Sequence, residues 1–368
     1  MKVNSIISKY LIRNFLTNFF GVLVMILGII LMFEIIDLLR RVADRTDVGF
    51  GFVMQMALTK LPRTVEMVFP FVVMISAMMT FWKFSKSNEF VVIRAAGVSV
   101  WGFLSPILFC AFMIGIVNIV LINPMSSKMF EYHETLDYRF KTKNPKAMLF
   151  NSKGLWIREA IENDNTMVLQ AKSLRQENDN LFLNKITIIE MDQNSRPIRR
   201  IEAFAGELNK GYFDLADIRI YSEGKETLTQ NNMQYNTTLD LDRIRENFIE
   251  PEAISFWDLP RTIRFYEMSG FSVQKHVMRY FSLLISPFML CAMIFVAAVF
   301  SLRPNVRKGG VILMIVGGVA TGFTVYFLSQ IIYAFGLNDY IPIWLAVISP
   351  SLITVLFAVS VLLHLEDG

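Results

Sequence analysis

Residues 14–33 read NFLTNFFGVLVMILGIILMF, an unbroken run without a charged side chain between Arg13 and Glu34. A helix that crosses a bilayer needs about 20 predominantly apolar residues, so this run is long enough to span a membrane by itself. It exceeds the apolar core of roughly 7–15 residues found in cleavable signal peptides, and no small-residue cleavage site follows it. The sequence therefore predicts an integral membrane protein that keeps its first span.

Five further apolar runs predict five further spans. They lie between residues 52 and 83, 94 and 128, 279 and 303, 308 and 339, and 339 and 364. The second span is the one that needs an explanation, because Pro62, Glu66 and Pro70 interrupt it; prolines at membrane depth are tolerated where neighbouring helices or water satisfy the freed carbonyls. Gly318 and Gly322 in the fifth span predict close packing against another helix. The composition agrees, since 54% of the 368 residues are hydrophobic and 18% are charged, against roughly 25% charged residues in soluble domains.

The stretch 147–247 between spans three and four is polar and has a different pattern. Short alternating runs at 155–157, 167–169, 185–189 and 217–221 predict strands, and clusters rich in Asn, Asp and Gly separate them. Such spacing is typical of an antiparallel sandwich or jelly roll. The pattern leaves open whether two sheets pack together or splay apart around an apolar groove. Apolar residues at helical intervals predict that the third span continues as a helix over 127–141, and start and stop signals predict a second flanking helix at 258–269.

The fold class predicted is an α-helical membrane protein with six transmembrane helices, three before and three after an inserted extracytoplasmic β-jellyroll-like domain. We expect residues 1–126 to hold the first three spans, 127–270 the β domain and 271–368 the last three spans. Basic residues favour the cytoplasmic side of short loops. One side of the predicted topology carries Lys2, Lys9, Arg13, Lys83, Lys86, Arg94, Arg303, Arg307 and Lys308, and the other only Arg40, Arg41 and Arg45. This bias predicts cytoplasmic termini and an extracytoplasmic β domain.

Motifs for enzymatic chemistry are absent from the sequence. It contains no phosphate-binding loop of the form G-x-x-x-x-G-K-[ST], no C-x-x-C, no H-E-x-x-H and no G-x-S-x-G. His133, His276 and His364 are scattered along the chain, so no metal site is expected. Cys110 and Cys291 lie in apolar runs and are interpreted as packing residues. With a net charge of +4 and no basic stripe, a nucleic-acid partner is not expected either.

The loop between spans two and three reads SKSNEFVVIRAAGVS at residues 85–99. Ser87 or Asn88 can cap a short helix there, and Gly97 can end it. This helix either lies on the bilayer surface or docks into a cytoplasmic partner. A transport protein without a nucleotide site needs such a docking element. The residues expected to make this contact are Ser87, Glu89, Phe90, Ile93, Arg94 and Gly97.

Several motifs point to one family. They are SNEFVVIRAAG at 87–97, Leu61-Pro62-Arg63 followed by Phe69-Pro70, Gly154-Leu155-Trp156, Gly322-Phe323 with Tyr326 and Gln330, and Ile341-Pro342 followed by Pro350. Over essentially its whole length the chain resembles the permease subunits of the lipopolysaccharide-export ABC transporter, the LptF/LptG (YjgP/YjgQ) family, and the 87–97 segment resembles that family's coupling helix. The motifs at 154–156 and 322–330 favour the LptG-type subunit.

The resemblance implies a permease that extracts lipopolysaccharide from the outer leaflet of a Gram-negative inner membrane and passes it to a periplasmic bridge. The implied partners are a second, LptF-type permease, a dimeric cytoplasmic ATPase of the LptB type and a single-span periplasmic bridge protein of the LptC type. The partner ATPase would bind ATP and Mg²⁺, and this chain would carry no cofactor.

The resemblance also implies which residues contact the substrate. Spans one and five would line an apolar cavity through Ile26, Ile30, Phe33, Phe323, Tyr326 and Phe327. Arg40, Arg41 and Arg63, at the outer ends of the first two spans, suit lipid A phosphates because guanidinium groups bind phosphate in a bidentate manner. Their alternative role is snorkelling to lipid headgroups. Glu34 departs from the family, whose members often carry a basic residue near this depth, and it can pair with Arg41 or with a basic residue of the partner permease.

Two other interpretations stay open. The first is a permease for another large lipid or for lipoproteins, which the same cavity could serve. The second is a membrane-anchored scaffold or sensor whose β domain binds a ligand. A scaffold would tolerate loss of the partner ATPase without a transport defect, whereas a permease would not.

Overall fold

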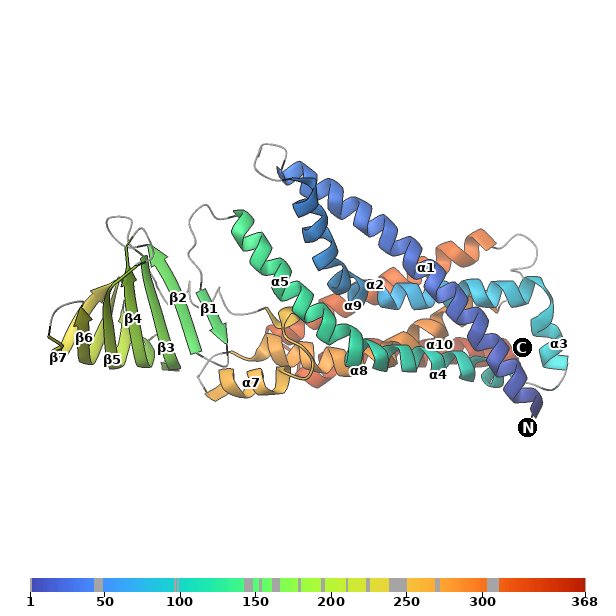
Figure 1. The fold of residues 1–368 in the computed structure, drawn as a ribbon. Coiled ribbons are helices and arrows are strands. Elements are labelled where there is room, and N and C mark those ends of the chain that lie inside the picture. Colours follow the sequence, from blue (N-terminus) through green and yellow to red (C-terminus); the bar gives the residue numbers. More distant parts are fainter. Residues whose placement is uncertain are drawn as a thin grey trace. The chain divides into compact units, whose positions relative to one another are not determined.

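The computed structural model describes every residue except 1, 43–48, 96, 98, 142–147, 152–153, 161–165, 178–179, 193–195, 210, 223–225, 238–249, 269–271, 303–310 and 368. The chain forms two compact units. The first comprises Met1–His133 and Val277–Gly368, and the second comprises Glu134–His276. Figure 1 shows the helices of the first unit and the sheet of the second.

Long helices build the first unit. They are α1 (Lys2–Val42), α2 (Phe50–Lys86), α4 (Val100–Val117), α8 (Gln274–Ser301), α9 (Val311–Leu337) and α10 (Ile343–Asp367), together with the short α3 (Glu89–Ala95). A π-helix, η1 (Asn118–Ile122), joins α4 to α5 (Asn123–Lys141) without a break. Among the described residues, six helical segments are long and apolar enough to cross a membrane, with α4, η1 and α5 counted as one. The prediction of six spans around an inserted domain is confirmed.

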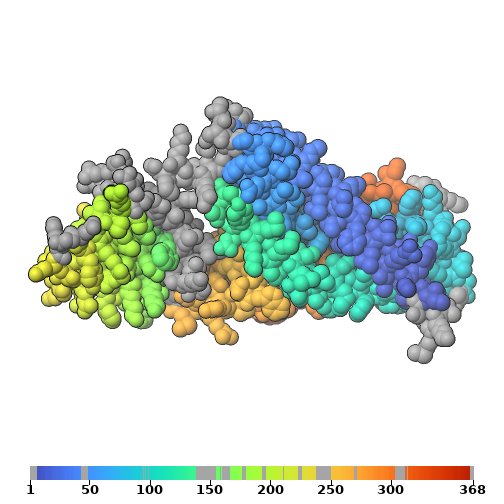
Figure 2. Space-filling model, in the orientation of Figure 1, coloured from blue at the N-terminus to red at the C-terminus, as the bar shows by residue number. Residues whose placement is uncertain are grey.

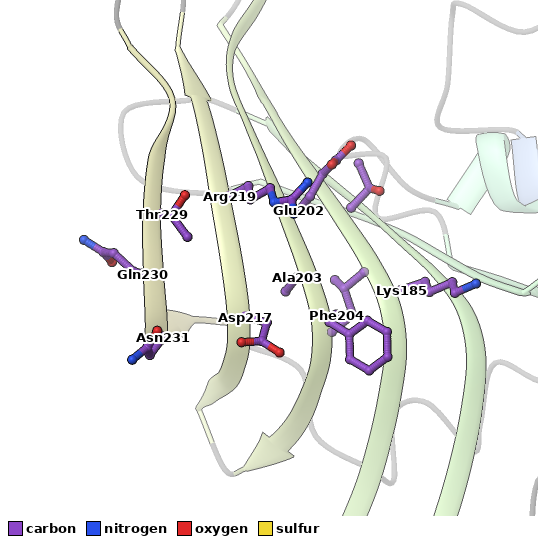
Figure 3. A pocket seen from close by; sticks show the side chains of 11 residues that line it. Lys185, Glu202, Ala203, Phe204, Asp217, Arg219, Thr229, Gln230 and Asn231 are labelled. Atoms are coloured by element: carbon purple, nitrogen blue, oxygen red, sulfur yellow. The ribbon is translucent and has the colours of Figure 1, made fainter.

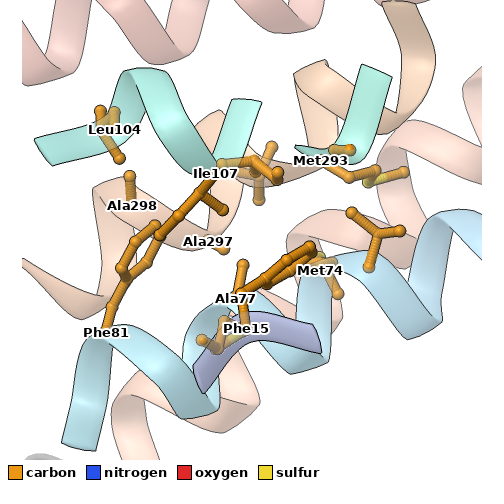
Figure 4. Close-up of a cluster of buried hydrophobic side chains, with 14 of the residues drawn as sticks. Phe15, Met74, Ala77, Phe81, Leu104, Ile107, Met293, Ala297 and Ala298 are labelled. Atoms are coloured by element: carbon orange, nitrogen blue, oxygen red, sulfur yellow. The ribbon is translucent and has the colours of Figure 1, made fainter. Parts of the chain in front are cut away.

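The core of the first unit forms around α2 and α8. Half of the most apolar stretch of α2 is buried, and 56% of that of α8. Side chains from α1, α2, α4 and α8 meet there, as Figure 4 shows. Fully buried members include Phe15, Met74, Phe81, Leu104 and Met293. Because close-packed interiors deform little, these helices form the rigid part of the unit.

The helices α1 and α9 contribute few of their residues to this core. Each packs against α2, but only 11% of the most apolar stretch of either helix is buried. The space-filling view shows α1, in blue, lying open along one face of the first unit (Figure 2). Both helices therefore carry long apolar surfaces that the described part of this chain leaves uncovered.

Two glycines let α9 approach α2 closely. A Cβ added to Gly318 would overlap the side chain of Met78, and one added to Gly322 would overlap that of Met74. The close packing predicted from this pair of glycines is confirmed. The methionine side chains fill the space that the missing Cβ atoms leave.

The second unit contains a seven-stranded antiparallel sheet in which the strands follow chain order. Its strands are β1 (Met148–Asn151), β2 (Gly154–Ala160), β3 (Thr166–Glu177), β4 (Asn180–Met191), β5 (Pro197–Asn209), β6 (Tyr212–Ser222) and β7 (Leu228–Asn236). The four runs predicted as strands lie in β2, β3, β4 and β6. One face is buried, as the alternation in β4 shows through Leu181, Leu183, Ile186 and Ile188. The prediction of an inserted antiparallel β domain is confirmed.

The sheet curls until distant strands meet. In a flat sheet with a strand spacing of about 4.8 Å, β2 and β7 would lie roughly 24 Å apart. Instead, Thr237, directly after β7, donates a hydrogen bond from Oγ1 to Oε2 of Glu159 on β2, at 2.7 Å. The hydroxyl of Tyr235 on β7 donates to Oε1 of Glu190 on β4, at 2.9 Å. The jellyroll-like domain is therefore one curled sheet with a buried inner face. The strands toward its two ends face each other, as the two sheets of a sandwich would.

Two residues with positive φ bend the sheet. Lys185 in β4 has a φ of 52° and Asp217 in β6 has a φ of 53°, values that residues other than glycine rarely adopt. The strand pairing skips both positions, since β4 pairs with β5 through Asn184 and Ile186 but not through Lys185. The buried alternation shifts by one residue there, so that the same face stays apolar on both sides of the bend.

The helix α7 (Leu259–Met268) packs on the buried face of the sheet. It follows η3 (Pro251–Ala253), and its first turn is closed by the N–H of Thr262, which donates to the carbonyl of Asp258 at 3.0 Å. Tyr266 on α7 is 1% exposed and belongs to the apolar cluster of the sheet. This burial raises the pKa of the Tyr266 phenol to about 12. The helix predicted at 258–269 is confirmed.

Candidate functional site

The loop between the second and third spans folds into the predicted short helix, α3. Asn88 has a φ of 59°, and its carbonyl accepts hydrogen bonds from the N–H groups of Val91 at 3.1 Å and Val92 at 3.3 Å. Glu89 lies in the first turn. Gly97 follows the helix with a φ of 82°, a left-handed conformation that glycine adopts without steric cost.

Phe90 fastens α3 to the first unit. Its ring is 8% exposed and meets the edge of the Phe103 ring with centroids 5.2 Å apart. Ile93 is half-buried against the same core. The face that carries Phe90 and Ile93 is thus turned inward, because a short helix held between two spans must bury one side against them. Val91 and Val92, which sequence reasoning did not single out, are 45% and 68% exposed.

The other predicted docking residues lie at the ends of α3. Glu89 is half-buried and Ser87 is exposed. The Ser87 hydroxyl donates to the carbonyl of Lys83 at 3.0 Å, which closes the last turn of α2. Arg94 belongs to α3, but its side chain lies outside the described part of the structure.

The predicted cavity residues lie on the uncovered faces of α1 and α9. Phe33, Phe323 and Phe327 are 62%, 60% and 66% exposed, whereas Ile26, Ile30 and Tyr326 are half-buried. The rings of Phe323 and Tyr326 contact Phe71 of α2, with centroid distances of 5.1 Å and 5.3 Å. The structure therefore gathers these residues on apolar surface that flanks α2.

The three predicted arginines differ in their surroundings. Arg40 is exposed, and Arg41 forms an ion pair with Asp37 one turn earlier, at 2.6 Å. The guanidinium carbon of Arg63 lies 4.0 Å from the centroid of the Phe130 ring. This contact with a ring of α5 orients the guanidinium of Arg63.

Glu34 pairs with a residue that sequence reasoning missed. Its Oε1 accepts a hydrogen bond from Nζ of Lys60 on α2 at 2.7 Å. The expected pairing with Arg41 is wrong, because Arg41 is held by Asp37. A signal for the real partner exists in the sequence, since Glu34 lies eight residues before the end of α1 and Lys60 ten residues after the start of α2. In an antiparallel pair of helices, such positions lie at one level.

A second ionic contact lies deeper in the unit. Oε2 of Glu66 on α2 accepts from Nη2 of Arg279 on α8 at 2.5 Å, and their side chains are 7% and 20% exposed. Oε1 of Glu66 accepts from Nδ2 of Asn123 at 3.1 Å. In the sequence, Glu66 and Arg279 mark only the ends of apolar runs, and nothing local reveals that they meet.

Metal ligands do not converge in the described part of the chain, where no three His, Cys, Asp or Glu side chains form a group. Nδ1 of the buried His133 lies 3.3 Å from Oγ1 of Thr59 and 3.1 Å from the carbonyl of Met56. His276 packs against the Tyr266 ring, and His364 is exposed on α10. The three histidines thus belong to separate structural contacts.

The outer face of the sheet has a shallow hollow of about 560 Å³ across β4 to β7, which the sequence did not predict. It lies at the bend marked by Lys185 and Asp217, and Figure 3 shows the polar side chains that surround it. Glu202 and Arg219, on adjacent strands, form part of its lining together with the exposed ring of Phe204. Both signs of charge are present, so the hollow has no single electrostatic preference.

The chain is similar to known proteins along nearly its whole length. Residues 9–364 match the family described as "Lipopolysaccharide export system permease LptF/LptG". The chain belongs to the LptF/LptG permease family. It is 19% identical to the "Lipopolysaccharide export system permease protein LptG" of Escherichia coli K12 over 364 residues, which cover 95% of this chain and 96% of the relative. The protein of the same name from Escherichia coli O6:H1 matches with the same identity and coverage.

As an LptF/LptG permease, the chain is a multi-pass membrane protein and a transport subunit. The match to the LptF/LptG family includes both units, the helix α3 and the uncovered faces of α1 and α9. Both candidate regions thus lie within the part of the chain that the family shares.

Proposed function

We propose that this chain is the LptG-type permease of an ATP-driven transporter that extracts lipopolysaccharide from the outer leaflet of the inner membrane and passes it to a periplasmic bridge. The observation that carries the proposal is the uncovered apolar surface of α1 and α9, since only 11% of the most apolar stretch of each helix is buried. The two curated relatives named LptG support the subunit type.

A second permease of the LptF type completes the cavity. The faces of α1 and α9 that carry Phe33, Phe323 and Phe327 form one half of its wall, and the matching helices of the partner form the other half. Acyl chains of lipid A fill the apolar interior, whose burial contributes about 25 cal/mol per Å² of apolar surface. A cavity between two subunits can open and close without unfolding either of them.

Cations near the outer ends of α1 and α2 hold the phosphates of lipid A. Arg63, oriented on Phe130, and the exposed Arg40 are the proposed contacts, and Arg41 joins them when it leaves Asp37. The ion pair of Arg41 is half-exposed, and such pairs are worth only about 0–1 kcal/mol. A phosphate can therefore displace Asp37 at little cost.

The helix α3 transmits the work of a dimeric cytoplasmic ATPase of the LptB type, which binds ATP and Mg²⁺. The exposed side chains of Val91 and Val92 and the half-buried Glu89 contact that ATPase, while Phe90 ties α3 to the helices of this chain. Closure of the ATPase dimer moves α3 and narrows the cavity. The termini lie in the cytoplasm, and the sheet lies in the periplasm beside a single-span partner of the LptC type.

Purification tests this proposal most directly. The tagged chain, expressed in its native cell and purified in mild detergent, is expected to bring along a second six-span permease, an ATPase and bound lipopolysaccharide. A purified chain that carries neither ATPase nor glycolipid would contradict the proposal and favour a scaffold or sensor.

Charge reversal at Arg63 separates lipopolysaccharide from other lipids. Arg63→Glu is expected to abolish extraction of a phosphorylated lipid and to leave the extraction of a neutral lipid nearly unchanged. Phe130→Leu, which removes the supporting ring but not the charge, serves as the milder comparison. Equal extraction by the unmodified chain and by Arg63→Glu would support a permease for another lipid or for lipoproteins.

A further inference from the structure

One carboxylate of α2 holds two other helices at once. Glu66 accepts from Asn123 through Oε1 at 3.1 Å and from Arg279 through Oε2 at 2.5 Å. The Glu66 side chain is 7% exposed and that of Arg279 is 20% exposed. Asn123 is 1% exposed. At such burial, an ion pair persists only where its geometry and extra hydrogen bonds offset the loss of solvation, so this arrangement is specific.

The two helices that Glu66 holds are the ones that lead the chain into and out of the second unit. Asn123 is the first residue of α5, which runs to Lys141 and carries the chain toward β1. Arg279 lies in the second turn of α8, which follows α7 and returns the chain to the first unit. All three contact residues belong to the first unit. A shift of α2 at Glu66 therefore acts on both connections to the sheet.

The same helix leads in the other direction to α3. From Glu66, α2 runs to Lys86, twenty residues or about 30 Å at a rise of 1.5 Å per residue. Between Val72 and Phe84 this stretch contributes many of the fully buried side chains of the core, so it moves as a stiff rod. The first residue after the two-residue turn that ends α2 is Glu89 of α3.

Glu66 lies where α2 can bend. Pro62 and Pro70 stand four residues before and after it, and each proline removes one backbone hydrogen bond of the helix. Figure 1 shows that α2 changes direction along its length. Next to Asn123, the third span contains the π-helix η1, a form that occurs often at functional sites. Both helices thus have a deformable point beside the Glu66 contact.

The contact between Glu66 and Arg279 can also rearrange. Arg279 engages Glu66 through Nη2 alone, and its buried Nε has no hydrogen-bond partner within the described residues. A buried donor without a hydrogen-bond partner costs free energy, and the contact keeps one unused donor. It can gain a hydrogen bond when α8 shifts against α2, so the resting arrangement does not lock the helices together.

We propose that Glu66 is the positioning residue that transmits the movement of α3 to the two helices connecting the membrane unit with the β sheet. This inference rests on the proposed function for its driving force. Glu66 acts through Asn123 and Arg279 and makes no contact with the lipid. Its loss leaves lipid capture by the cavity intact and uncouples capture from delivery to the sheet.

The test uses the assembled transporter in nanodiscs, with Cys110 and Cys291 replaced by alanine. Spin labels at Ala95→Cys, an exposed position on α3, and at Glu131→Cys on α5 report the distance between these helices, with and without a vanadate-trapped nucleotide. A photo-crosslinker at Phe323 reports capture of lipopolysaccharide, and one at Leu183 reports delivery to the sheet. The variants are Glu66→Gln, Glu66→Arg and the charge swap Glu66→Arg with Arg279→Glu. Glu202→Gln, which breaks the surface pair with Arg200, is the control.

The unmutated chain and Glu202→Gln are expected to show a nucleotide-dependent change of the spin-label distance. Glu66→Gln and Glu66→Arg should lose that change and deliver at least tenfold less lipid per molecule captured, and the charge swap should restore both. The inference is overturned if the unmutated chain shows no distance change, if Glu66→Gln keeps it, or if the swap restores nothing. An intact distance change without any lipid capture would overturn the proposed function and not the role of Glu66.

Discussion

Phe90 shows how a single side chain separates anchoring from docking. Its ring packs against Phe103 and is 8% exposed, whereas Val92, two residues later, is 68% exposed. The sequence indicates that Phe90 and Ile93 share a face, but it does not say which way that face points. The direction of that face depends on where α2 and α4 lie, and no local sequence pattern includes both of these helices.

Phe90→Ala is expected to destabilise the first unit. Removal of a buried phenylalanine ring typically costs about 3–5 kcal/mol, while Val92→Ala at the surface should change the stability by less than about 0.5 kcal/mol. Thermal unfolding of both variants in the same detergent measures the difference. Equal unfolding temperatures would contradict the anchoring role of Phe90.

The pair between Glu34 and Lys60 predicts a competition with phosphate. Glu34→Gln removes the carboxylate that holds Lys60 Nζ at 2.7 Å, and the released ammonium group can then bind a phosphate of lipid A. We expect lipopolysaccharide capture to rise about two- to fivefold, because a partly exposed ion pair contributes up to about 1 kcal/mol. Crosslinking yield at limiting lipopolysaccharide measures this change.

Lys60→Met is the comparison for that experiment and should lower capture. Asp37→Asn, which breaks the exposed pair with Arg41, should have a smaller effect than Glu34→Gln. If Glu34→Gln lowers capture as much as Lys60→Met does, the pair holds α1 against α2 and does not compete with the lipid.

At the scale of elements, the helix α3 is the one whose function depends on a partner. Glu89→Ala is expected to leave assembly with the ATPase largely intact and to lower lipid-stimulated ATP turnover several-fold, because Glu89 is half-buried in the first turn of the docking helix. Arg94→Ala should act in the same direction. Turnover assays of the reconstituted complex, with Glu267→Ala on α7 as the control, measure it. Unchanged turnover and export in both variants would remove the coupling assignment.

The packing of α7 on the sheet predicts a dependence of stability on pH. The pKa of the Tyr266 phenol is raised to about 12 by burial, against about 10 in the unfolded chain. A raised pKa favours the protonated folded form, so its contribution is complete below pH 10 and is lost as the pH rises toward 12. At pH 11 the free energy of unfolding is therefore lower by about 1.4 kcal/mol, which corresponds to one pKa unit.

Tyr266→Phe keeps the ring and removes the titrating group. Its free energy of unfolding should therefore fall less between pH 9 and pH 11 than that of the unmodified chain. Urea unfolding of the full chain, followed by cleavage of the sheet with an alkali-stable protease, measures the free energy of unfolding of both proteins at each pH. Burial also raises the pKa of Tyr235, which contributes equally to both proteins. Identical pH slopes would contradict the burial of the Tyr266 hydroxyl in solution.

The elements themselves were largely predictable from the sequence, since apolar length and alternation are local properties. The runs that became α1, α8 and α10 are simple examples. The curl of the sheet was not predictable, because it arises at Lys185 and Asp217, two charged residues that adopt positive φ without the glycine that usually signals it. The hydrogen bond between Thr237 and Glu159 joins residues 78 positions apart, and no spacing rule reaches that far.

On the scale of the whole molecule, α1 and α9 expose apolar faces that the described part of the chain does not cover. Its core is complete around α2 and α8, but the two peripheral helices bury little of their apolar surface. The sequence predicts the residues on these faces through family resemblance, and the structure shows that Phe33, Phe323 and Phe327 are exposed. The contact between Glu66 and Arg279 could be found only in the assembled helices, because it joins separate spans and no local pattern indicates it.

Site-specific photo-crosslinking from α1 and α9 tests the central claim most directly. Crosslinkers at Phe33 and Phe323 face the proposed cavity, and one at the exposed Phe357 on α10 serves as the control for nonspecific lipid contact. In the complex with its ATPase, both cavity positions should capture lipopolysaccharide, and ATP should lower that capture as the lipid leaves. If neither position captures lipopolysaccharide above the level at Phe357, with ATP or without it, the account is contradicted.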